Sequence, residues 1–368
     1  MSVNMSTDEW VALGTAIACG YDFALIRDGH NGALQMICDD GSGRRPHSAR
    51  RVTLCPWPCT EAYTINDIVS MDDLTATDRD GEGTPERPWP LTTARTEYLK
   101  RVGAVADRLR QNGGKVVLSR TIAGELDREP DFVIDDVLAG NPDTLRIAFY
   151  KKGLGLWVAA TPELLLHADN RTIHSMALAG TRPLEANGPW DDKNLAEHGY
   201  VVDFITDKFR QAGLNPQTEC PHELRTSTVE HLCTMISAPN YGFDADGRQH
   251  KLIADPLALA MELAPTPAVC GFPRDRALET IQATEGHPRR MYGGFVAVSD
   301  EEPAGDGNVW RTFTAHVMLR CAQLDLHNYC IYAGGGITAL SDPAAEWDEA
   351  QAKAQTLLGS VQSLEFKV

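Results

Sequence analysis

Apolar and polar positions along the chain follow two periods, one helical and one typical of strands. Trp10, Leu13 and Ile17 are spaced as on one face of a helix, so a helix is predicted near the N-terminus. The same spacing predicts helices over residues 93–112, 194–211 and 255–263. A last helix is predicted to begin at Asp342-Pro343, because an acidic N-cap followed by proline at the first helical position favours initiation.

Short runs rich in apolar residues predict strands between these helices. They cover residues 22–26, 115–120, 145–151, 155–160, 173–178, 291–299, 309–321 and 328–333. The last three are separated by turn-rich stretches and predict a hairpin meander. Residues 240–250 predict a loop, and the polar stretch 72–92, rich in Asp, Gly and Pro, predicts an exposed one. Strands and helices interleave without a strict β-α-β rhythm, which favours an α+β fold with large antiparallel sheets over a doubly wound sheet.

Length and charge narrow the class of protein. A chain of 368 residues is consistent with two domains of about 150 residues each or with one large domain. Its 43% hydrophobic and 23% charged residues are typical of a globular protein with a sizeable core. Subtracting 51 acidic from 34 basic residues gives a net charge of −17, and the basic residues are scattered, which argues against a nucleic-acid partner.

Targeting signals and cysteines favour a cytoplasmic protein without a membrane segment. No run approaches the ~18 apolar residues that a membrane-spanning helix needs. Asp8 and Glu9 precede any Lys or Arg, and the N-terminus lacks the h-region of a signal peptide, so no secretory signal is expected. The nine cysteines are therefore expected to be reduced thiols. The spacing of Cys55 and Cys59 does not match the usual zinc-binding pairs.

The last predicted helix carries the first candidate site. Glu346, Glu349 and Lys353 are spaced at i, i+3 and i+7 and share one helical face, which Leu357 continues toward the core. A solvated ladder of Glu and Lys is the commoner meaning of such spacing. The Gly-rich run 333–337 favours a site instead, because bare backbone leading to a helix suits an anionic ligand.

A second carboxylate lies in the helix predicted over 194–211. Glu197 shares a stripe with Val201 and Ile205 and therefore points toward the core. A buried carboxylate must be paired, protonated or bound to a metal. Taken alone, a salt bridge is the favoured interpretation, with Lys193 as the candidate partner.

Three further charged residues border apolar runs: Lys115 opens a predicted core strand, Glu163 precedes three leucines, and Arg320 stands between apolar residues. Desolvation lowers the pKa of such a lysine and raises that of such a carboxyl, which suits them to act as base and acid. The ordinary alternatives are a lysine that extends to solvent at a strand end and a glutamate in a surface turn. Arg320 in a core strand requires an anion, and a carboxylate ligand is its natural partner.

Several common catalytic motifs are absent from the sequence. The chain has no G-x-x-x-x-G-K-[ST], G-x-S-x-G or H-E-x-x-H motif, and no strand-linked G-x-G-x-x-G. ATP hydrolysis, serine hydrolysis and hydride transfer are therefore disfavoured.

Collinear segments from residue 115 to 353 resemble the chorismate-utilising enzymes, a family that includes isochorismate, salicylate, anthranilate and aminodeoxychorismate synthases. The segments are Lys115-Val-Val-Leu-Ser-Arg120, Pro162-Glu-Leu-Leu165, Ala177-Leu-Ala-Gly-Thr-Arg-Pro183, Glu197-His198, Glu230-His-Leu232, Pro265-Thr-Pro-Ala-Val-Cys-Gly271, Tyr292-Gly-Gly294, Ala333-Gly-Gly-Gly-Ile337 and Ser341-Asp-Pro343 with Glu346, Glu349 and Lys353. Residues 1–92 carry no matching motif. The resemblance implies one chorismate-binding domain over 1–368, with its catalytic core in 93–368. It also implies a two-layer sandwich of antiparallel sheets flanked by helices, with the active-site cleft between the sheets and the outer helices.

The resemblance also implies roles for single residues. Lys115 resembles the general base of the family and Glu163 its general acid. Glu197 and Glu349 resemble Mg²⁺ ligands, with Glu346 nearby through water. The implied substrate-binding residues are Gly180, Thr181, His231, Val269, Arg320, Gly334 and Lys353, of which Arg320 and Lys353 receive substrate carboxylates.

The form Pro265-Thr-Pro-Ala-Val269 resembles the water-using isochorismate synthases rather than the ammonia-using members. It implies a Mg²⁺-dependent isomerisation of chorismate to isochorismate, with water added at C2 and the C4 hydroxyl lost, by a monomer without a glutaminase subunit. Ala264 and Leu184 replace the family's usual His and Arg, which leaves the fine specificity open. The use of the product, for menaquinone or for a siderophore, is open as well. Salicylate synthase is the near alternative, and anthranilate or aminodeoxychorismate synthase a further one. A non-catalytic chorismate-binding protein is the alternative from another class.

Overall fold

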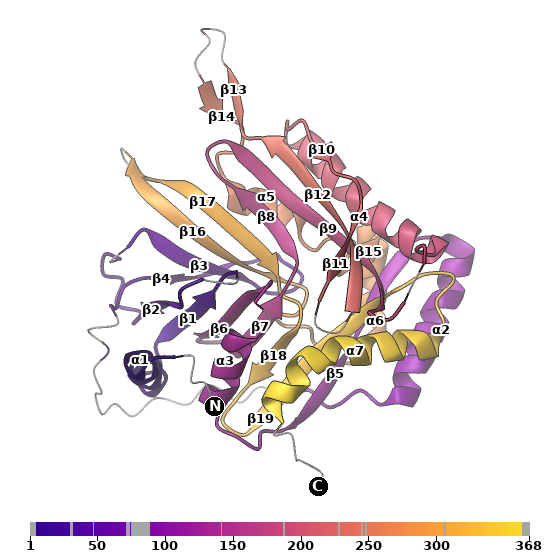
Figure 1. The fold of residues 1–368 in the computed structure, drawn as a ribbon, viewed down its shortest axis with the longest axis horizontal. Helices are drawn as coiled ribbons and strands as arrows, with labels where there is room; N and C mark the ends of the chain where they lie inside the picture. The colour runs from indigo at the N-terminus through magenta and orange to yellow at the C-terminus, as the bar shows by residue number, and fades with distance from the viewer. Residues whose placement is uncertain are drawn as a thin grey trace.

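Two large antiparallel sheets pack face to face, and helices cover their outer faces (Figure 1). The computed structural model describes residues 5–29, 32–46, 48–70, 74, 89–140, 142–186, 188–226, 229–243, 246, 249–304 and 307–362. Apart from Leu74 and residues 89–92, the exposed loop predicted over 72–92 lies outside these described residues.

Eight strands form the first sheet. They are β1 (Asp22–Arg27), β2 (Gln35–Asp39), β5 (Lys115–Glu125), β6 (Leu145–Lys151), β7 (Gly155–Thr161), β15 (Gly271–Phe272), β18 (Cys321–Leu324) and β19 (Asn328–Ile337). Their order across the sheet is β15-β5-β19-β18-β7-β6-β1-β2. The pairing of β5 with β19 sets Val117 opposite Gly336 and Ser119 opposite Gly334, so the strand that begins at Lys115 lies beside the glycine run.

Nine strands form the second sheet. They are β3 (Arg50–Cys55), β4 (Tyr63–Asn66), β8 (Leu164–Ala168), β9 (Thr172–Pro183), β10 (Gln217–Thr218), β11 (His222–Arg225), β12 (Val229–Pro239), β16 (Phe295–Ala304) and β17 (Gly307–Val317). Eight of them follow the order β10-β12-β9-β8-β17-β16-β3-β4, and β11 pairs with β12. The strands of the N-terminal part thus extend both sheets, with β1 and β2 at one edge of the first and β3 and β4 at one edge of the second.

The described residues include seven helices. They are α1 (Thr7–Ala18), α2 (Arg95–Asn112), α3 (Pro130–Ala139), α4 (Asp192–Gln211), α5 (Pro256–Leu263), α6 (Arg274–Thr284) and α7 (Pro343–Val361). None of these helices combines the length and the apolar character that crossing a bilayer demands.

Each helix buries its apolar stripe against one of the sheets. α1, α3 and α7 contribute Leu13, Val137 and Leu357 to a core on the outer face of the first sheet. α4 and α5 contribute Val201 and Leu259 to a core on the second sheet. A third core lies between the sheets and includes Phe149, Trp157 and Val296. The helical and strand periods of the sequence therefore correspond to real buried faces.

Side-chain caps fix the starts of the two helices that carry glutamates of interest. Asp342 accepts a hydrogen bond from the Ala345 amide at 2.9 Å, with Pro343 in the first turn of α7, which confirms the predicted start. Asp191 caps α4 in the same way, accepting from the Asn194 amide at 2.8 Å.

The predicted strand over 309–321 is wrong at its C-terminal end, and Arg320 is not in a strand. β17 stops at Val317, Arg320 adopts a left-handed backbone with φ of 47°, and the chain enters the other sheet at Cys321. The hairpins β16–β17 and β18–β19 therefore lie in different sheets and do not form one meander. The end of one strand and the start of the next cannot be recognised in the sequence, because the chain is largely buried, and therefore apolar, on both sides of the crossing.

Two smaller predictions also need correction. Residues 240–250 are not simply a loop, since β13 (Tyr241–Phe243) pairs with β14 (Gln249–Lys251). The strand predicted from residue 291 begins only at Phe295, because residues 290–293 form a turn in which Arg290 and Gly293 have positive φ.

Candidate active site

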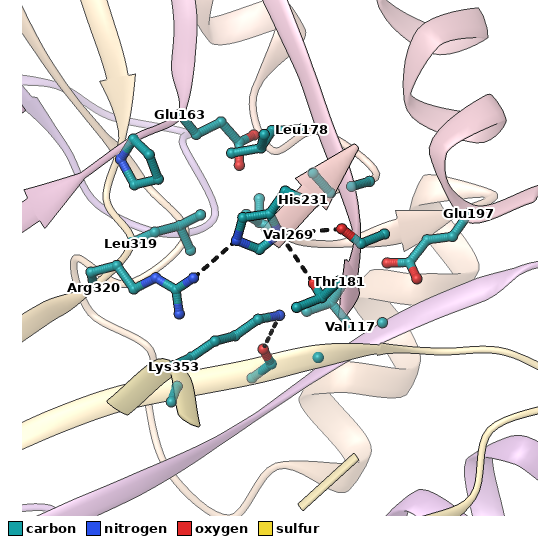
Figure 2. Close-up of a pocket in the computed structure, with 18 of the residues that line it drawn as sticks. Val117, Glu163, Leu178, Thr181, Glu197, His231, Val269, Leu319, Arg320 and Lys353 are labelled. Atoms are coloured by element: carbon teal, nitrogen blue, oxygen red, sulfur yellow. Dashed lines mark hydrogen bonds between the residues drawn. The ribbon is translucent and has the colours of Figure 1, made fainter. Parts of the chain in front are cut away.

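A pocket lies where β5, β9, β12 and β19 approach helices α4 and α7 (Figure 2). Nine of the twelve predicted site residues line it: Glu163, Gly180, Thr181, Glu197, His231, Val269, Arg320, Gly334 and Lys353. The other three, Lys115, Glu346 and Glu349, lie directly against this lining. Residues spread over more than half of the chain therefore meet in one place.

One end of the pocket is built over the glycines of β19. A Cβ on Gly335 would lie 3.0 Å from Glu346 Oε2 and 3.4 Å from Glu349 Oε1. A Cβ on Gly336 would lie only 2.2 Å from Glu197 Oε1, a distance that no real side chain tolerates. The glycines are therefore needed to make room for three carboxylates, and their position inside a strand corrects the prediction that they act as backbone leading to a helix start.

Lys115 and Glu197 form a buried ion pair at this end. Lys115 is fully buried, and its Nζ lies 2.8 Å from Glu197 Oε1. The predicted pairing of Glu197 with Lys193 is wrong, since Lys193 Nζ lies 2.5 Å from Glu346 Oε1. Lys193 and Glu197 are neighbours on α4, but the docking of α7 decides which carboxylate the lysine reaches. For Lys115 to accept a proton, its pairing with Glu197 must first loosen.

Lys353 connects helix α7 with the glycine strand. Its Nζ lies 2.6 Å from Glu349 Oε1 and donates to the Gly334 carbonyl at 3.2 Å. Burial raises the pKa of Glu349, but Lys353 outweighs burial, so the pKa lies below its usual range. Burial and the nearby charge of Glu349 raise the pKa of Glu346, against the effect of Lys193. The helical face predicted from spacing is thus a largely buried charge cluster and not a solvated ladder.

These carboxylates are also the groups that could hold a cation. Glu346 Oε2 is buried, and no group among the described residues donates a hydrogen bond to it. Within the same residues, no three His, Cys, Asp or Glu side chains come close enough to ligate an ion by themselves. Mg²⁺ takes one or two protein carboxylates and completes its shell with water and an anionic substrate. Glu197 and Glu349, with Glu346 close by, fit this requirement.

Glu163 closes the other end of the pocket from the turn between β7 and β8. Its side chain is buried, and Oε1 accepts no hydrogen bond from the described residues, so the alternative of a surface turn is wrong. Burial raises the pKa of Glu163 to about 8, although Lys115, Lys353 and Arg320 act in the opposite direction. The carboxyl is therefore largely protonated at neutral pH and able to donate a proton.

His231 is held in one tautomer by its neighbours. Arg320 Nη2 donates to His231 Nε2 at 3.1 Å, while Nδ1 lies 3.2 Å from the Gly180 carbonyl and 3.1 Å from Thr181 Oγ1. Because arginine can only donate, Nε2 accepts and Nδ1 carries the proton. Burial, Arg320 and Lys353 hold the pKa of His231 well below its usual range, so the ring is neutral. Burial lowers the pKa of Arg320 to about 10, which leaves the guanidinium charged.

Figure 2 shows how these groups surround one space. Arg320 and Glu163 lie on one side of His231 and Glu197 on the other, and Lys353 reaches in from α7. The pocket thus combines two cations, a protonated carboxyl and a carboxylate cluster. Such a set can bind a small polyanion and supply a proton to a leaving group.

Several lining residues were not anticipated as site residues. They are Val117, Leu178, Ala268, Tyr292, Leu319 and Tyr332. Val117 could have been found, because it lies two residues after Lys115 and therefore on the same face of β5. Tyr292 stacks on Tyr332 with ring centroids 5.8 Å apart, a contact between the turn before β16 and the middle of β19 that no local pattern reveals.

Comparison with known proteins identifies the family. The family described as chorismate binding enzyme matches residues 70–362. The chain belongs to this chorismate-binding enzyme family. A provisionally named isochorismate synthase, MenF, from Mycobacterium tuberculosis is 33% identical over 300 residues, which cover 71% of this chain and 72% of that protein. The isochorismate synthase DhbC of Bacillus subtilis is 34% identical over 217 residues, 55% of this chain and 49% of that protein.

Two solved structures, one of an isochorismate synthase and one of an anthranilate synthase component, have the same fold as this chain. The Escherichia coli protein MenF, described as a menaquinone-specific isochorismate synthase, superposes with a TM-score of 0.73 at 21% identity, covering 98% of this chain and 92% of the other. Anthranilate synthase component I from Streptococcus pneumoniae superposes with a TM-score of 0.60 at 16% identity, covering 91% and 89%. The chorismate-binding enzyme fold predicted from the sequence is therefore confirmed.

Proposed function

We propose that this protein is an isochorismate synthase, which adds water to C2 of chorismate and releases the C4 hydroxyl as water. The observation that carries the proposal is a protonated carboxyl, Glu163, and a buried lysine, Lys115, at one pocket that also contains the cations Arg320 and Lys353. Relatives named as isochorismate synthases, at 33% and 34% identity, support the same activity.

Substrate binding depends on local positive charge in an acidic chain. Chorismate carries two carboxylates, and Arg320 and Lys353 are the charged groups of the pocket suited to receive them. Arg320 is held by His231 Nε2 at 3.1 Å, so its guanidinium keeps one orientation. Fixing both carboxylates sets the ring between acid and base and removes the orientational part of the barrier.

The displacement needs one proton removed and one supplied. Lys115 in its neutral amine form, released from Glu197, takes a proton from the water that attacks C2. Glu163 gives its proton to the C4 oxygen, which leaves as water while the ring double bonds shift. One water enters and one leaves, so the product is an isomer of the substrate. Acid and base act together only when their environments move the two pKa values toward opposite roles, and the burial of Glu163 meets that condition for the acid.

We further propose Mg²⁺ as the cofactor, held by Glu197 and Glu349, with Glu346 through water. A divalent cation bound there supplies positive charge that neutralises and positions a substrate carboxylate. Two observations support this set: the buried Glu346 Oε2, to which none of the described residues donates a hydrogen bond, and the space that Gly335 and Gly336 leave for the three carboxylates.

Product analysis tests the proposed function directly. Purified protein is incubated with chorismate, with and without MgCl₂ and with and without ammonium chloride, and the products are separated by liquid chromatography with mass detection. We expect isochorismate in the samples with MgCl₂, independent of ammonium. Salicylate with pyruvate would assign the near alternative, aminated products would assign the ammonia-using branch, and binding without turnover would assign a non-catalytic protein.

Three further expectations accompany the proposal. The protein acts as a monomer without a glutaminase subunit, which size-exclusion chromatography with light scattering can check. We assign it to the cytoplasm, a proposal that the nine free cysteines support. Relatives are named for menaquinone and for vibriobactin, so the product serves a quinone or a siderophore, and the neighbouring genes can distinguish the two.

A further inference from the structure

A buried arginine–glutamate pair lies directly behind the pocket wall. Arg289 follows helix α6 and is 3% exposed, and its Nε and Nη2 donate to Glu285 at 2.8 and 2.6 Å. Burial lowers the pKa of Arg289, but the Glu285 carboxylate more than offsets this, so the net pKa is raised and the guanidinium stays charged. Neither residue lines the pocket.

The same guanidinium binds the backbone of two pocket-lining residues. Arg289 Nη1 donates to the Val269 carbonyl and Nη2 to the Val117 carbonyl, both at 2.7 Å. Glu285 Oε1 in turn accepts from the Ser119 amide at 2.5 Å and from Ser119 Oγ at 2.9 Å. The start of β5 and the loop that carries Val269 are therefore tied to one another through a single planar group.

These two segments carry the groups that act on the attacking water. Lys115 is the proposed base, and it lies two residues before Val117 on the same strand face. Val269 lines the pocket and ends the segment Pro265–Val269, whose form resembles the water-using members of the family. A shift of either tied carbonyl changes the distance between base and water, whereas no hydrogen bond or ion pair among the described residues joins Arg289 to Arg320 or Lys353.

We propose that Arg289 is a positioning residue for the attacking water: it fixes the carbonyls of Val117 and Val269 and thereby sets the gap between base and nucleophile. The inference rests on the proposed function and adds to it a residue outside the pocket. Only arginine fits the position, because four contacts are made by donors in one plane, and a lysine ammonium offers three donors from a single atom.

Trp57 brings the N-terminal part of the chain into this arrangement. Its ring covers the guanidinium of Arg289, with the guanidinium carbon 4.2 Å from the ring centroid. A Cβ on Gly293 would lie 3.0 Å from the Trp57 ring, so a side chain at this position would crowd the indole. Residues 1–92, which carry no family motif, therefore support the pocket wall indirectly.

Arg289→Lys tests the proposal, with Arg146→Lys as the matched control. Arg146 is 2% exposed and also donates to two backbone carbonyls, those of Leu138 and Gly29, but neither residue lines this pocket. We expect kcat per folded protein to fall about 10- to 100-fold in Arg289→Lys, the range that a displacement of ~1 Å produces. KM for chorismate is expected to stay within about 2-fold, because uniform binding is unchanged. Arg146→Lys is expected to keep the kcat of the wild-type protein.

The choice of nucleophile gives a readout that loss of stability does not move. With ammonium chloride present, we expect the wild-type protein and the control to make isochorismate alone, whereas Arg289→Lys forms a measurable fraction of aminated product beside it. Equal kcat and equal product ratios in the two variants, or a raised KM with unchanged kcat, would overturn the proposal. Should Arg289→Lys not fold, Trp57→Leu is the second variant, because it retains the hydrogen bonds of Arg289 but removes the ring that covers the guanidinium. An unchanged product ratio in Trp57→Leu would then also overturn the proposal. A wild-type protein that makes another product from chorismate would refute the proposed function, yet the rate ratio between variant and wild type would still decide the role of Arg289.

Discussion

The two ends of the pocket hold buried carboxylates in opposite ways. Over the glycines of β19, Glu197, Glu346 and Glu349 each have a lysine nitrogen within 2.8 Å. At the other end, Glu163 is buried as deeply as Glu346, but its Oε1 has no hydrogen-bond partner among the described residues, and its pKa rises to about 8. The two ends differ in pairing: each of the three glutamates forms an ion pair with a lysine, whereas Glu163 forms none with the described residues. Pairing brings the pKa below its usual range at Glu349 but not at Glu346, where burial and the charge of Glu349 prevail over Lys193. A paired carboxylate can bind a cation, whereas the buried and unpaired Glu163 is suited to donate a proton.

The largest effect is expected from removing the proton donor. Glu163→Gln keeps the size of the side chain and its lack of charge at neutral pH but cannot give up a proton to the leaving group. We expect kcat to fall about 10²- to 10⁴-fold, the usual contribution of a general acid, while the Kd for chorismate changes little. Steady-state kinetics and calorimetric binding measure the two quantities. Full activity in Glu163→Gln would show that Glu163 is not the proton donor, and the two ends of the pocket would then not differ in this role.

The next largest effect is expected where the glycines make room for the glutamates. A Cβ in Gly336→Ala would meet Glu197 Oε1 at 2.2 Å, so the carboxylate must move. We expect the Mg²⁺ concentration for half-maximal activity to rise about 10- to 100-fold, as it does when the supports of a metal site are disturbed.

Gly359→Ala provides the control for that change. Gly359 lies in α7, and a Cβ there meets nothing within 4 Å. It is expected to leave the Mg²⁺ dependence unaltered. If added Mg²⁺ and chelators do not change the activity of the wild-type protein, the glutamates only form ion pairs with the lysines and do not bind a metal.

A pH profile separates the two ends without any substitution. Since the acid form of Glu163 is the active one and its pKa is about 8, kcat is expected to be level at neutral pH and to fall as pH rises through about 8. His231 adds no ionisation in this range, because its pKa is held well below the usual value. A rate that rises through pH 8 would assign the proton donor elsewhere.

Folding stability is also expected to depend on pH through Glu163. The pKa of Glu163 is higher in the folded protein, about 8, than the 4.5 of a free side chain, so the folded state binds the extra proton between these values. The stability that this proton confers is complete below pH 4.5 and is lost as pH rises to about 8, a change of up to about 5 kcal/mol. Glu163→Gln is expected to lack this loss, so denaturation curves of the two proteins should diverge between pH 5 and 8. Parallel curves would mean that Glu163 is already ionised.

Much of the fold and the site could be predicted because their signals are local. The start of α7 at Pro343 follows from its cap, and the inward face of Glu197 follows from helical spacing. The predictions that failed concern contacts between segments. Lys193 pairs with Glu346 instead of Glu197, because α7 docks beside α4. Arg320 lies where the chain crosses from one sheet to the other. The crossing could not be predicted, because a left-handed residue inside an apolar run does not change the pattern of hydrophobicity.

The sequence by itself determined most of the long helices and strands, the α+β class, the family and a set of twelve residues that lie at or against one pocket, because periodicity, caps and collinear motifs are properties of the chain. Only the tertiary structure decided which lysine faces which glutamate, that Glu163 forms no ion pair with the described residues, and that Arg289 ties two wall segments together. These outcomes depend on distances between strands and helices far apart in the chain, and the ionisation of a buried group depends on such distances more than on its own identity.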